Sequence, residues 1–488
     1  MASIQDRRRP RLSKKQRQQR RQRQARKARQ ARRQLQQLHA QLPKTARHLF
    51  DCFRPAFSLP TYYRFVFLLS AALLTVGNRT VLNLLRTLSA FAPGAPSSYH
   101  RVFSHRRWSS WTVARGLLAF LLEHWLPRGP IQLAGDDTVD EHPGKKVHGK
   151  GCHRDPVRST HSYTAFRWGH KWVVLAVLVR FPFARRPWAL PVLVALYRTE
   201  EDNQRYARRH KTPPQLLGQL LLVLLRWFPD RHWVCAADGN YATHELAGLA
   251  HRYQPRLTYL SHFYADANLY EAAPVVQGKK PSGRPRKKGR PLPKPQEVVA
   301  RTRRRQPLNV SWYGGGRRDV EVVSGTAHWY RGGQPLVPVL WVWVHDCTGT
   351  HRDEYFFTTA VTWSVAAVIE TYTGRWNLET TFQELRAYLG LETTRGWTEQ
   401  TVLRAAPCLF GLYTVVALLY AQLPGKYRRQ RTVCWPGKED VTFSEAITAA
   451  RRWLWVEWVF VIPGHRSAFS KLSRPFQSLL LSALAPAA

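Results

Sequence analysis

Acidic residues are scarce in this sequence, and their scarcity limits the partners that the chain can have. The 488 residues include 31 Asp and Glu against 75 Lys and Arg, which gives a formal net charge of +44. A chain with so large an excess of one sign repels itself unless a polyanion neutralises it. The basic residues are spread along the whole chain and do not form one patch, so we expect nucleic acid as the partner rather than a membrane surface.

Paired cysteines, a signal peptide and long apolar runs are also missing. The six cysteines include no Cys-x-x-Cys pair, which argues against a zinc ribbon or a disulfide framework and suits a cytoplasmic protein with reduced thiols. No apolar core follows the basic first residues closely, which argues against a secretory signal. The longest apolar stretch, residues 405–423, contains Pro407 and Gln422 and is near the lower length limit of a membrane span. We therefore expect a buried helix there and no membrane partner.

The first quarter of the chain reads as a tail followed by helices. A chain of this length is expected to form two or three packed units. Residues 1–48 are rich in Arg and Gln and predict a basic low-complexity tail that could become helical on DNA but cannot fold alone; a solvated tail that only raises solubility is the alternative. Residues 49–127, with runs such as FVFLLSAALL and SSYHRVFSHRRWSSWTVARG, predict a helical DNA-binding region, although any solvated helix face would look similar.

From Ile131 onward, strands alternate with helices, which predicts a mixed α/β sheet. The segment VVQGKKPSGRPRKKGRPLPKPQ then interrupts the pattern and predicts an exposed basic loop. Its Arg284, Arg286 and Arg290 suit either insertion into a narrow minor groove or a nonspecific basic linker. This loop and the strands after it form a β-rich region at 266–350. Within the following region, 351–425, the chain is expected to be helical from about Thr359 through Ala421, and residues 426–488 form a C-terminal region.

Three acids stand where strands are predicted to end. Asp136 and Asp137 end IQLAGDDT, and Asp238 ends WVCAAD. Cleavage of a phosphodiester needs a metal-activated water, and the hard cations that supply it prefer carboxylate oxygens. Counting by twos puts Asp137 on the face of Ile131 and Leu133, which favours Asp137 over Asp136, although acids at strand ends are often turn formers or helix caps.

The run ETYTGRWNLETTFQELRAYLG holds a more specific pattern. Tyr372, Arg375, Glu379 and Arg386 are spaced so that, on one helix, they fall within roughly 60° of arc. A carboxylate between two Arg is expected to stay ionised and able to bind metal, while the Arg side chains and the phenol could hold phosphate oxygens. By contrast, His142, His148, Cys152 and His153 fit no common zinc spacing, so we expect a basic loop there and not a zinc site.

The residues just quoted resemble the DDE insertion-sequence transposases. Tyr372, Arg375, Glu379 and Arg386 match that family's Tyr-Arg-Glu-Lys signature, with Arg386 in place of the usual final Lys. GDDT and AADGNY look like its two Asp motifs, and RWNLETTFQELRAYLGLE resembles its acidic-helix block. The resemblance covers roughly residues 90–420.

The resemblance implies an α/β fold with an RNase H-like mixed sheet core, a helical N-terminal region and a β-rich insertion before the last catalytic acid. The core would be split between residues 128–265 and 351–425. It implies two Mg²⁺ or Mn²⁺ ions held by Asp137 (or Asp136), Asp238 and Glu379. Tyr372 and Arg375 would contact the scissile phosphate, and Arg386 would replace a phosphate-binding Lys.

The implied activity is that of a cut-and-paste transposase, an endonuclease and strand transferase. Its partners would be double-stranded DNA, at the transposon ends and the target, and a second copy of the chain in a synaptic complex, in the cytoplasm at the nucleoid. The alternative is a catalytically silent DNA-binding protein, either a decayed transposase or a repressor of the element ends.

Overall fold

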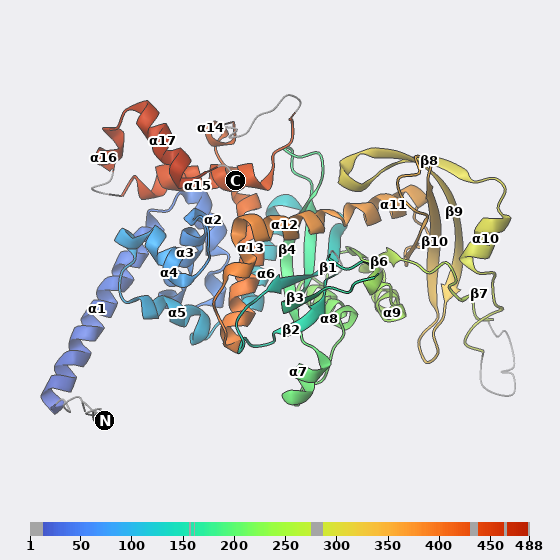
Figure 1. The fold of residues 1–488 in the computed structure, drawn as a ribbon, viewed down its shortest axis with the longest axis horizontal. Coiled ribbons are helices and arrows are strands. Elements are labelled where there is room, and N and C mark those ends of the chain that lie inside the picture. Colours follow the sequence, from blue (N-terminus) through green and yellow to red (C-terminus); the bar gives the residue numbers. More distant parts are fainter. Residues whose placement is uncertain are drawn as a thin grey trace.

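The computed structural model describes residues 13–155, 158–160, 162–274, 286–429, 438–462 and 466–486. Helices occupy one end of the molecule, a sheet flanked by helices lies in the middle, and further strands form the other end (Figure 1). The helices of the N-terminal region are α1 (Lys14–Ala40), α2 (Lys44–Asp51), α3 (Leu59–Leu74), α4 (Val81–Thr87), α5 (Pro96–Ser104) and α6 (Ser110–Trp125).

The segment expected to be a tail is helical from Lys14 onward, and its second half is packed. Ser13 caps α1 through a capping box with Gln16. Ala31, Leu35 and Leu38, spaced four and three residues apart, are buried, and α1 packs on α3. The prediction that residues 1–48 cannot fold without DNA is therefore corrected for this part of the segment. The first half of α1 extends away from the body, as Figure 1 shows.

The central sheet has the topology of an RNase H-like core. β1 (Ile131–Glu141) pairs antiparallel with β3 (Phe166–Val179), which pairs antiparallel with β4 (Trp188–Tyr197). On its other side β1 pairs in parallel with β5 (Trp233–Ala237), and β5 pairs in parallel with β6 (Leu257–His262). The spatial order β4-β3-β1-β5-β6 confirms the predicted fold class. A short strand, β2 (Gly151–Arg154), also pairs with β3.

Helices cover both faces of this sheet. α7 (Glu200–Arg205), α8 (Pro213–Trp227) and α9 (His244–Arg252) belong to the connections between β4, β5 and β6. Leu217 of α8 approaches Gly135 of β1 so closely that a Cβ at position 135 would lie 3.0 Å from it, which explains the glycine. α12 (Asn377–Leu389) and α13 (Glu399–Gln422) cover the other face, where Phe410 meets Trp172 of β3 with ring centroids 6.3 Å apart. Consecutive residues of β1 thus face different helices.

The expected β-rich insertion precedes the last acid, and it continues the core sheet. Its elements are β7 (Leu269–Tyr270), α10 (Pro295–Arg301), β8 (Gln306–Ser311), β9 (Arg317–Trp329), β10 (Val337–Asp346) and β11 (Glu354–Thr358). β11 pairs antiparallel with β6, so the sheet runs on to 11 strands. The insertion also has a second hydrophobic core, in which Val310, Val342 and Phe356 pack with Val368 and Ile369.

The helix expected to carry four functional residues is two helices. α11 (Val365–Gly374) ends and α12 begins around Arg375 and Trp376. The amides of Arg375 and Trp376 donate to carbonyls three residues earlier, at 3.0 and 3.2 Å, which tightens the backbone there. The assumption of one regular helix from residue 372 to 386 is therefore corrected, because a tightened turn rotates the second segment relative to the first.

The apolar stretch at residues 405–423 belongs to α13, a helix at the centre of the molecule (Figure 1). Among the described residues α13 is the one helix long and apolar enough to cross a membrane, and 67% of its most apolar window is buried inside the protein. It packs against α6, α12, β4 and α15. The last helices are α14 (Gly425–Arg428), α15 (Phe443–Leu454), α16 (Arg466–Ser470) and α17 (Arg474–Leu484).

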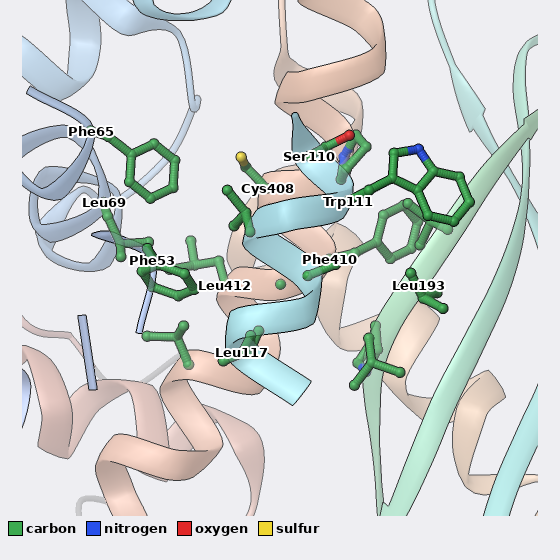
Figure 2. Close-up of a pocket in the computed structure, with 18 residues that line it drawn as sticks. Phe53, Phe65, Leu69, Ser110, Trp111, Leu117, Leu193, Cys408, Phe410 and Leu412 are labelled. Carbon is green, nitrogen blue, oxygen red and sulfur yellow. The ribbon is translucent and has the colours of Figure 1, made fainter. Parts of the chain in front are cut away.

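An apolar cavity of about 50 Å³ is lined by Phe53 and by residues of α3, α6, β4 and α13. In Figure 2, Phe53, Phe65 and Leu69 lie on one side of α6 and Leu193 on the other, with Cys408 and Phe410 on α13 behind. The lining includes no acidic or basic side chain. The cavity therefore marks an imperfectly packed seam between the helical region and the core.

Candidate active site

Three carboxylates from distant parts of the sequence converge on one guanidinium. Asp136 lies within β1, Asp238 directly follows the parallel strand β5, and Glu379 lies in the first turn of α12. Arg375 Nη1 donates to Asp136 Oδ2 at 2.7 Å, and Arg375 Nη2 lies 3.4 Å from Asp238 Oδ1 and 3.5 Å from Glu379 Oε1. We call Asp136, Asp238 and Glu379 the carboxylate cluster.

Asp137, which the strand pattern favoured, is not part of this cluster. Its carboxylate lies on the opposite face of β1, 3.0 Å from Lys171 Nζ, and it accepts a hydrogen bond from the Tyr241 hydroxyl at 2.8 Å. The preference for Asp137 over Asp136 therefore needs correction. It assumed that the ligand shares a face with Ile131 and Leu133, whereas α12 brings Glu379 to the face that Asp136 occupies.

The electrostatics of the carboxylate cluster show a deficit of positive charge. Burial raises the pKa of Asp136 to about 7, with Arg375 opposing the shift and Asp238 adding to it. The pKa of Glu379 is also raised, first by burial and then by Asp238 against the pull of Arg375. Burial lowers the pKa of Arg375, but Asp136 and its neighbours raise it by more, so this side chain stays charged. One cation among three acids leaves room for further positive charge.

The donor set fits a hard divalent cation. All three side chains offer carboxylate oxygens, the ligands that Mg²⁺ and Mn²⁺ prefer. Asp238 and Glu379 are 36% and 42% exposed, so ions and a substrate can reach them from solvent. The raised pKa values of Asp136 and Glu379 show that their charged forms are not fully compensated by Arg375, and a bound cation would compensate them.

Tyr372 lies beside the cluster but faces the core of the insertion. Its ring is 2% exposed, with its centroid 4.3 Å from that of Phe356 and 5.4 Å from that of His262. The guanidinium carbon of Arg375 lies 5.5 Å from the Tyr372 ring centroid. Burial raises the pKa of Tyr372 well above its usual range. The Tyr372 ring therefore packs beside the Arg375 guanidinium and helps to position it, while Arg375 makes the contacts with the acids.

Among the described residues, Arg386 makes no hydrogen bond or ion pair with the carboxylate cluster. Its guanidinium donates to the Thr138 hydroxyl and, at 3.2 Å, to the Val139 carbonyl oxygen. Its Nε lies 3.4 Å from Glu392 Oε1. These contacts fasten α12 to β1, so the structure does not place Arg386 with Arg375 and Glu379 as the single-helix assumption required.

A second polar group beside the cluster was not predicted. His262, the last residue of β6, lies 3.3 Å from Glu354 Oε1, and the Tyr313 hydroxyl donates to Glu354 Oε2 at 3.2 Å. A Cβ on Gly239, the residue after Asp238, would lie 3.6 Å from the Cβ of His262. The signal available in the sequence was the position of His262 at the end of the strand that follows β5, since parallel neighbours end at one edge.

The basic loop of the insertion is only partly described. Arg284 lies outside the described residues, while Arg286 and Arg290 are exposed. The Arg290 carbonyl accepts from the Glu271 amide at 2.9 Å, and Lys288 Nζ lies 3.8 Å from the Tyr270 ring centroid. This part of the loop belongs with β7 and is not joined to the carboxylate cluster by any contact among the described residues.

The loop that follows β1 sends one histidine inward. His142 joins Asp140 of β1 and His170 of β3 in a buried group, in which one ligand atom of each residue lies within 4.8 Å of the others. His148, Cys152 and His153 are not part of that group. Asp140 and His170 are separated by 30 residues, which is why sequence spacing did not connect them. We call Asp140, His142 and His170 the histidine cluster.

Comparisons with known proteins can be set beside this geometry. Among solved structures, the chain is similar to a piggyBac transposase synaptic complex with hairpin DNA, determined by cryo-EM, with 10% sequence identity and a TM-score of 0.37 over 92% of this chain and 83% of that chain. No curated protein matches the sequence. The family model described as DDE superfamily endonuclease matches residues 52–319, more than half of the chain. That range contains Asp136 and Asp238 and ends before Glu379.

Proposed function

The chain belongs to the DDE superfamily endonucleases, and from this premise we propose that it is a cut-and-paste DNA transposase. It would cleave DNA at the transposon ends in a metal-dependent reaction and join the freed ends to target DNA. The observation that carries the proposal is the meeting of Asp136, Asp238 and Glu379 around Arg375. Asp136 takes the place of the first acid, and Tyr372, Arg375, Glu379 and Arg386 stand for the Tyr-Arg-Glu-Lys signature.

The carboxylate cluster would hold two Mg²⁺ or Mn²⁺ ions. Such ions, when bound, activate a water and stabilise the leaving oxygen of a phosphodiester. Arg375 would then be released from neutralising three acids, and its N–H groups could donate to the phosphate oxygens of the DNA. Tyr372 supports Arg375 through its ring. Arg386 keeps α12 on β1, which fixes the position of Glu379 relative to Asp136.

The DNA-binding surface would include α1. The helix has no acidic residue, and its side chains from Lys14 to Gln30 are exposed where the structure describes them. At 1.5 Å per residue its 27 residues span about 40 Å, comparable to one turn of duplex DNA. Arg286 and Arg290 would add contacts from the insertion. These Lys and Arg side chains suit phosphate binding, which is independent of sequence and sensitive to salt.

A synaptic complex would hold two copies of the chain, because each chain supplies one carboxylate cluster and an element has two ends. A protein with this role would act in the cytoplasm, at the nucleoid.

The test is a cleavage assay on DNA that carries the element's own flanking ends, with Mg²⁺. Glu379→Ala is compared with Glu399→Ala, because the two side chains are almost equally exposed, at 42% and 43%, and both lie in the first turn of a helix. We expect nicking at the ends by the natural chain and by Glu399→Ala, and binding without nicking by Glu379→Ala. Binding without cleavage by the natural chain would instead favour the catalytically silent DNA-binding protein.

A further inference from the structure

The histidine cluster contains a contact that needs a cation. Asp140, His142 and His170 are 0%, 5% and 1% exposed. The Nε2 atom of His170 lies 2.9 Å from the His148 carbonyl oxygen, and since a carbonyl can only accept, Nε2 carries the proton. In the neutral ring, Nδ1 is then unprotonated and carries a lone pair. It has no hydrogen-bond partner and lies 3.5 Å from Asp140 Oδ1, another acceptor.

The second histidine approaches the same carboxylate. His142 Nε2 lies 3.3 Å from Asp140 Oδ2, and the ring centroids of His142 and His170 are 4.6 Å apart. Two ligands of a tetrahedral metal ion with bonds of about 2.0 Å lie about 3.3 Å from each other. The two contacts that Asp140 makes with the histidines are close to that separation: Oδ2 approaches His142, within hydrogen-bond distance, and Oδ1 approaches His170 Nδ1, which has no hydrogen-bond partner.

The surroundings of the cluster are those of a ligand shell. The His170 amide and Trp172 Nε1 donate to Asp140 at 3.1 and 3.3 Å, which orients the carboxylate. The hydrogen bond from His170 Nε2 to a backbone carbonyl is the usual support of a metal-bound histidine. Both histidines also line a small cavity of about 10 Å³, shared with Thr394, Gly396 and Thr401, which has room for about one water.

We propose that Asp140, His142 and His170 bind one Zn²⁺ ion, or a first-row divalent ion of the same class, with a water in the small cavity as the fourth ligand. Two imidazoles and one carboxylate suit Zn²⁺ better than Mg²⁺. Asp140 lies four residues beyond Asp136 on β1, about 13 Å along the strand, so one ion cannot serve both clusters. The ion would join β1, β3 and the loop after β1, and this inference does not depend on the proposed function.

Cobalt provides the test, because Co²⁺ replaces Zn²⁺ and a tetrahedral Co²⁺ site absorbs visible light. The full chain is produced in minimal medium with added Co²⁺, purified, and measured for metal content and visible absorption. We expect one tightly held Co²⁺ per chain with d–d bands of tetrahedral intensity. The same content and spectrum are expected for Glu379→Gln, which alters the carboxylate cluster, and for His148→Asn, which keeps the backbone carbonyl.

Two variants at His142 separate ligation from folding. His142→Asn should lose the cobalt bands, a result that misfolding alone could also produce. His142→Cys should bind Co²⁺ and gain a thiolate-to-cobalt charge-transfer band, a new signal that misfolding cannot produce. A natural chain without bound cobalt, cobalt that disappears in Glu379→Gln, or a His142→Cys protein without the charge-transfer band would overturn the proposal. The first of these results would leave a protonated His170 as the partner of Asp140.

Discussion

The carboxylate cluster and the histidine cluster both use side chains from one face of β1, but they differ in access to solvent. Asp238 and Glu379 are 36% and 42% exposed, whereas the three members of the histidine cluster are 5% exposed or less. The open cluster can exchange ions and admit a phosphodiester. We therefore expect the open cluster to act in the reaction and the buried cluster to act in stability.

The largest expected effect separates two neighbouring acids. Asp136→Asn should lower the cleavage rate about a thousandfold or more, because it removes charge where the substrate reacts. Asp137→Asn makes the same substitution on the opposite face of β1, beside Lys171 and Tyr241. Its cleavage rate should stay within about tenfold of the rate of the natural chain. Single-turnover cleavage of end DNA, with binding measured in parallel, checks both. Loss of cleavage in Asp137→Asn alone would reinstate Asp137.

The histidine cluster should show the reverse balance of effects. Asp140→Leu leaves the Trp172 Nε1 and the His170 amide without their acceptor and should cost about 3–5 kcal/mol of unfolding free energy. Glu379→Gln, at a half-exposed position, should change stability by about 0.5 kcal/mol or less. Urea unfolding of the two variants makes the comparison. Equal losses of stability would show that the clusters do not divide their roles in this way.

The raised pKa of Asp136 predicts how stability depends on pH. Asp136 has a folded pKa of about 7 against 3.8 in the unfolded chain, so between about pH 4 and 7 the unfolded state releases a proton that the folded state keeps. Its contribution to the free energy of unfolding is therefore greatest below about pH 4 and declines as pH rises to about 7. Without divalent ions, Asp136→Asn should show a weaker decline. If the stability of the natural chain and of Asp136→Asn depended on pH in the same way, the raised pKa of Asp136 would be wrong.

Arg386 should have the smallest effect. Arg386→Lys keeps the charge but loses the forked contacts with Thr138, Val139 and Glu392, which should cost about 1 kcal/mol of stability. Thermal unfolding gives this value, and DNA binding by the same variant is the control. Unchanged stability with weakened DNA binding would show instead that Arg386 contacts phosphate, as the signature of the family implies.

The regular parts of the fold were predictable because they rest on local patterns. Alternating strands and helices after Ile131, the β-rich insertion and the buried helix at residues 405–423 all follow from the periodicity of apolar residues. The packing of α1 was missed because four apolar residues in a basic segment, Ala31, Leu35, Leu38 and Leu42, are a weak local signal. They bury their side chains only because α3 and the C-terminal helices lie beside them.

The sequence by itself determined which residue types are available and their order: the neighbouring acids Asp136 and Asp137 in the first strand, Asp238 after a later strand, and Glu379 in a helix before Arg386. It also determined that Asp136 and Asp137 face opposite sides, since successive side chains of a strand alternate. Only the tertiary structure decided that α12 covers the face of Asp136, that Arg375 turns into the acids at a break between helices, and that His170 meets Asp140. These outcomes depend on which surfaces pack together, and local periodicity does not specify that choice.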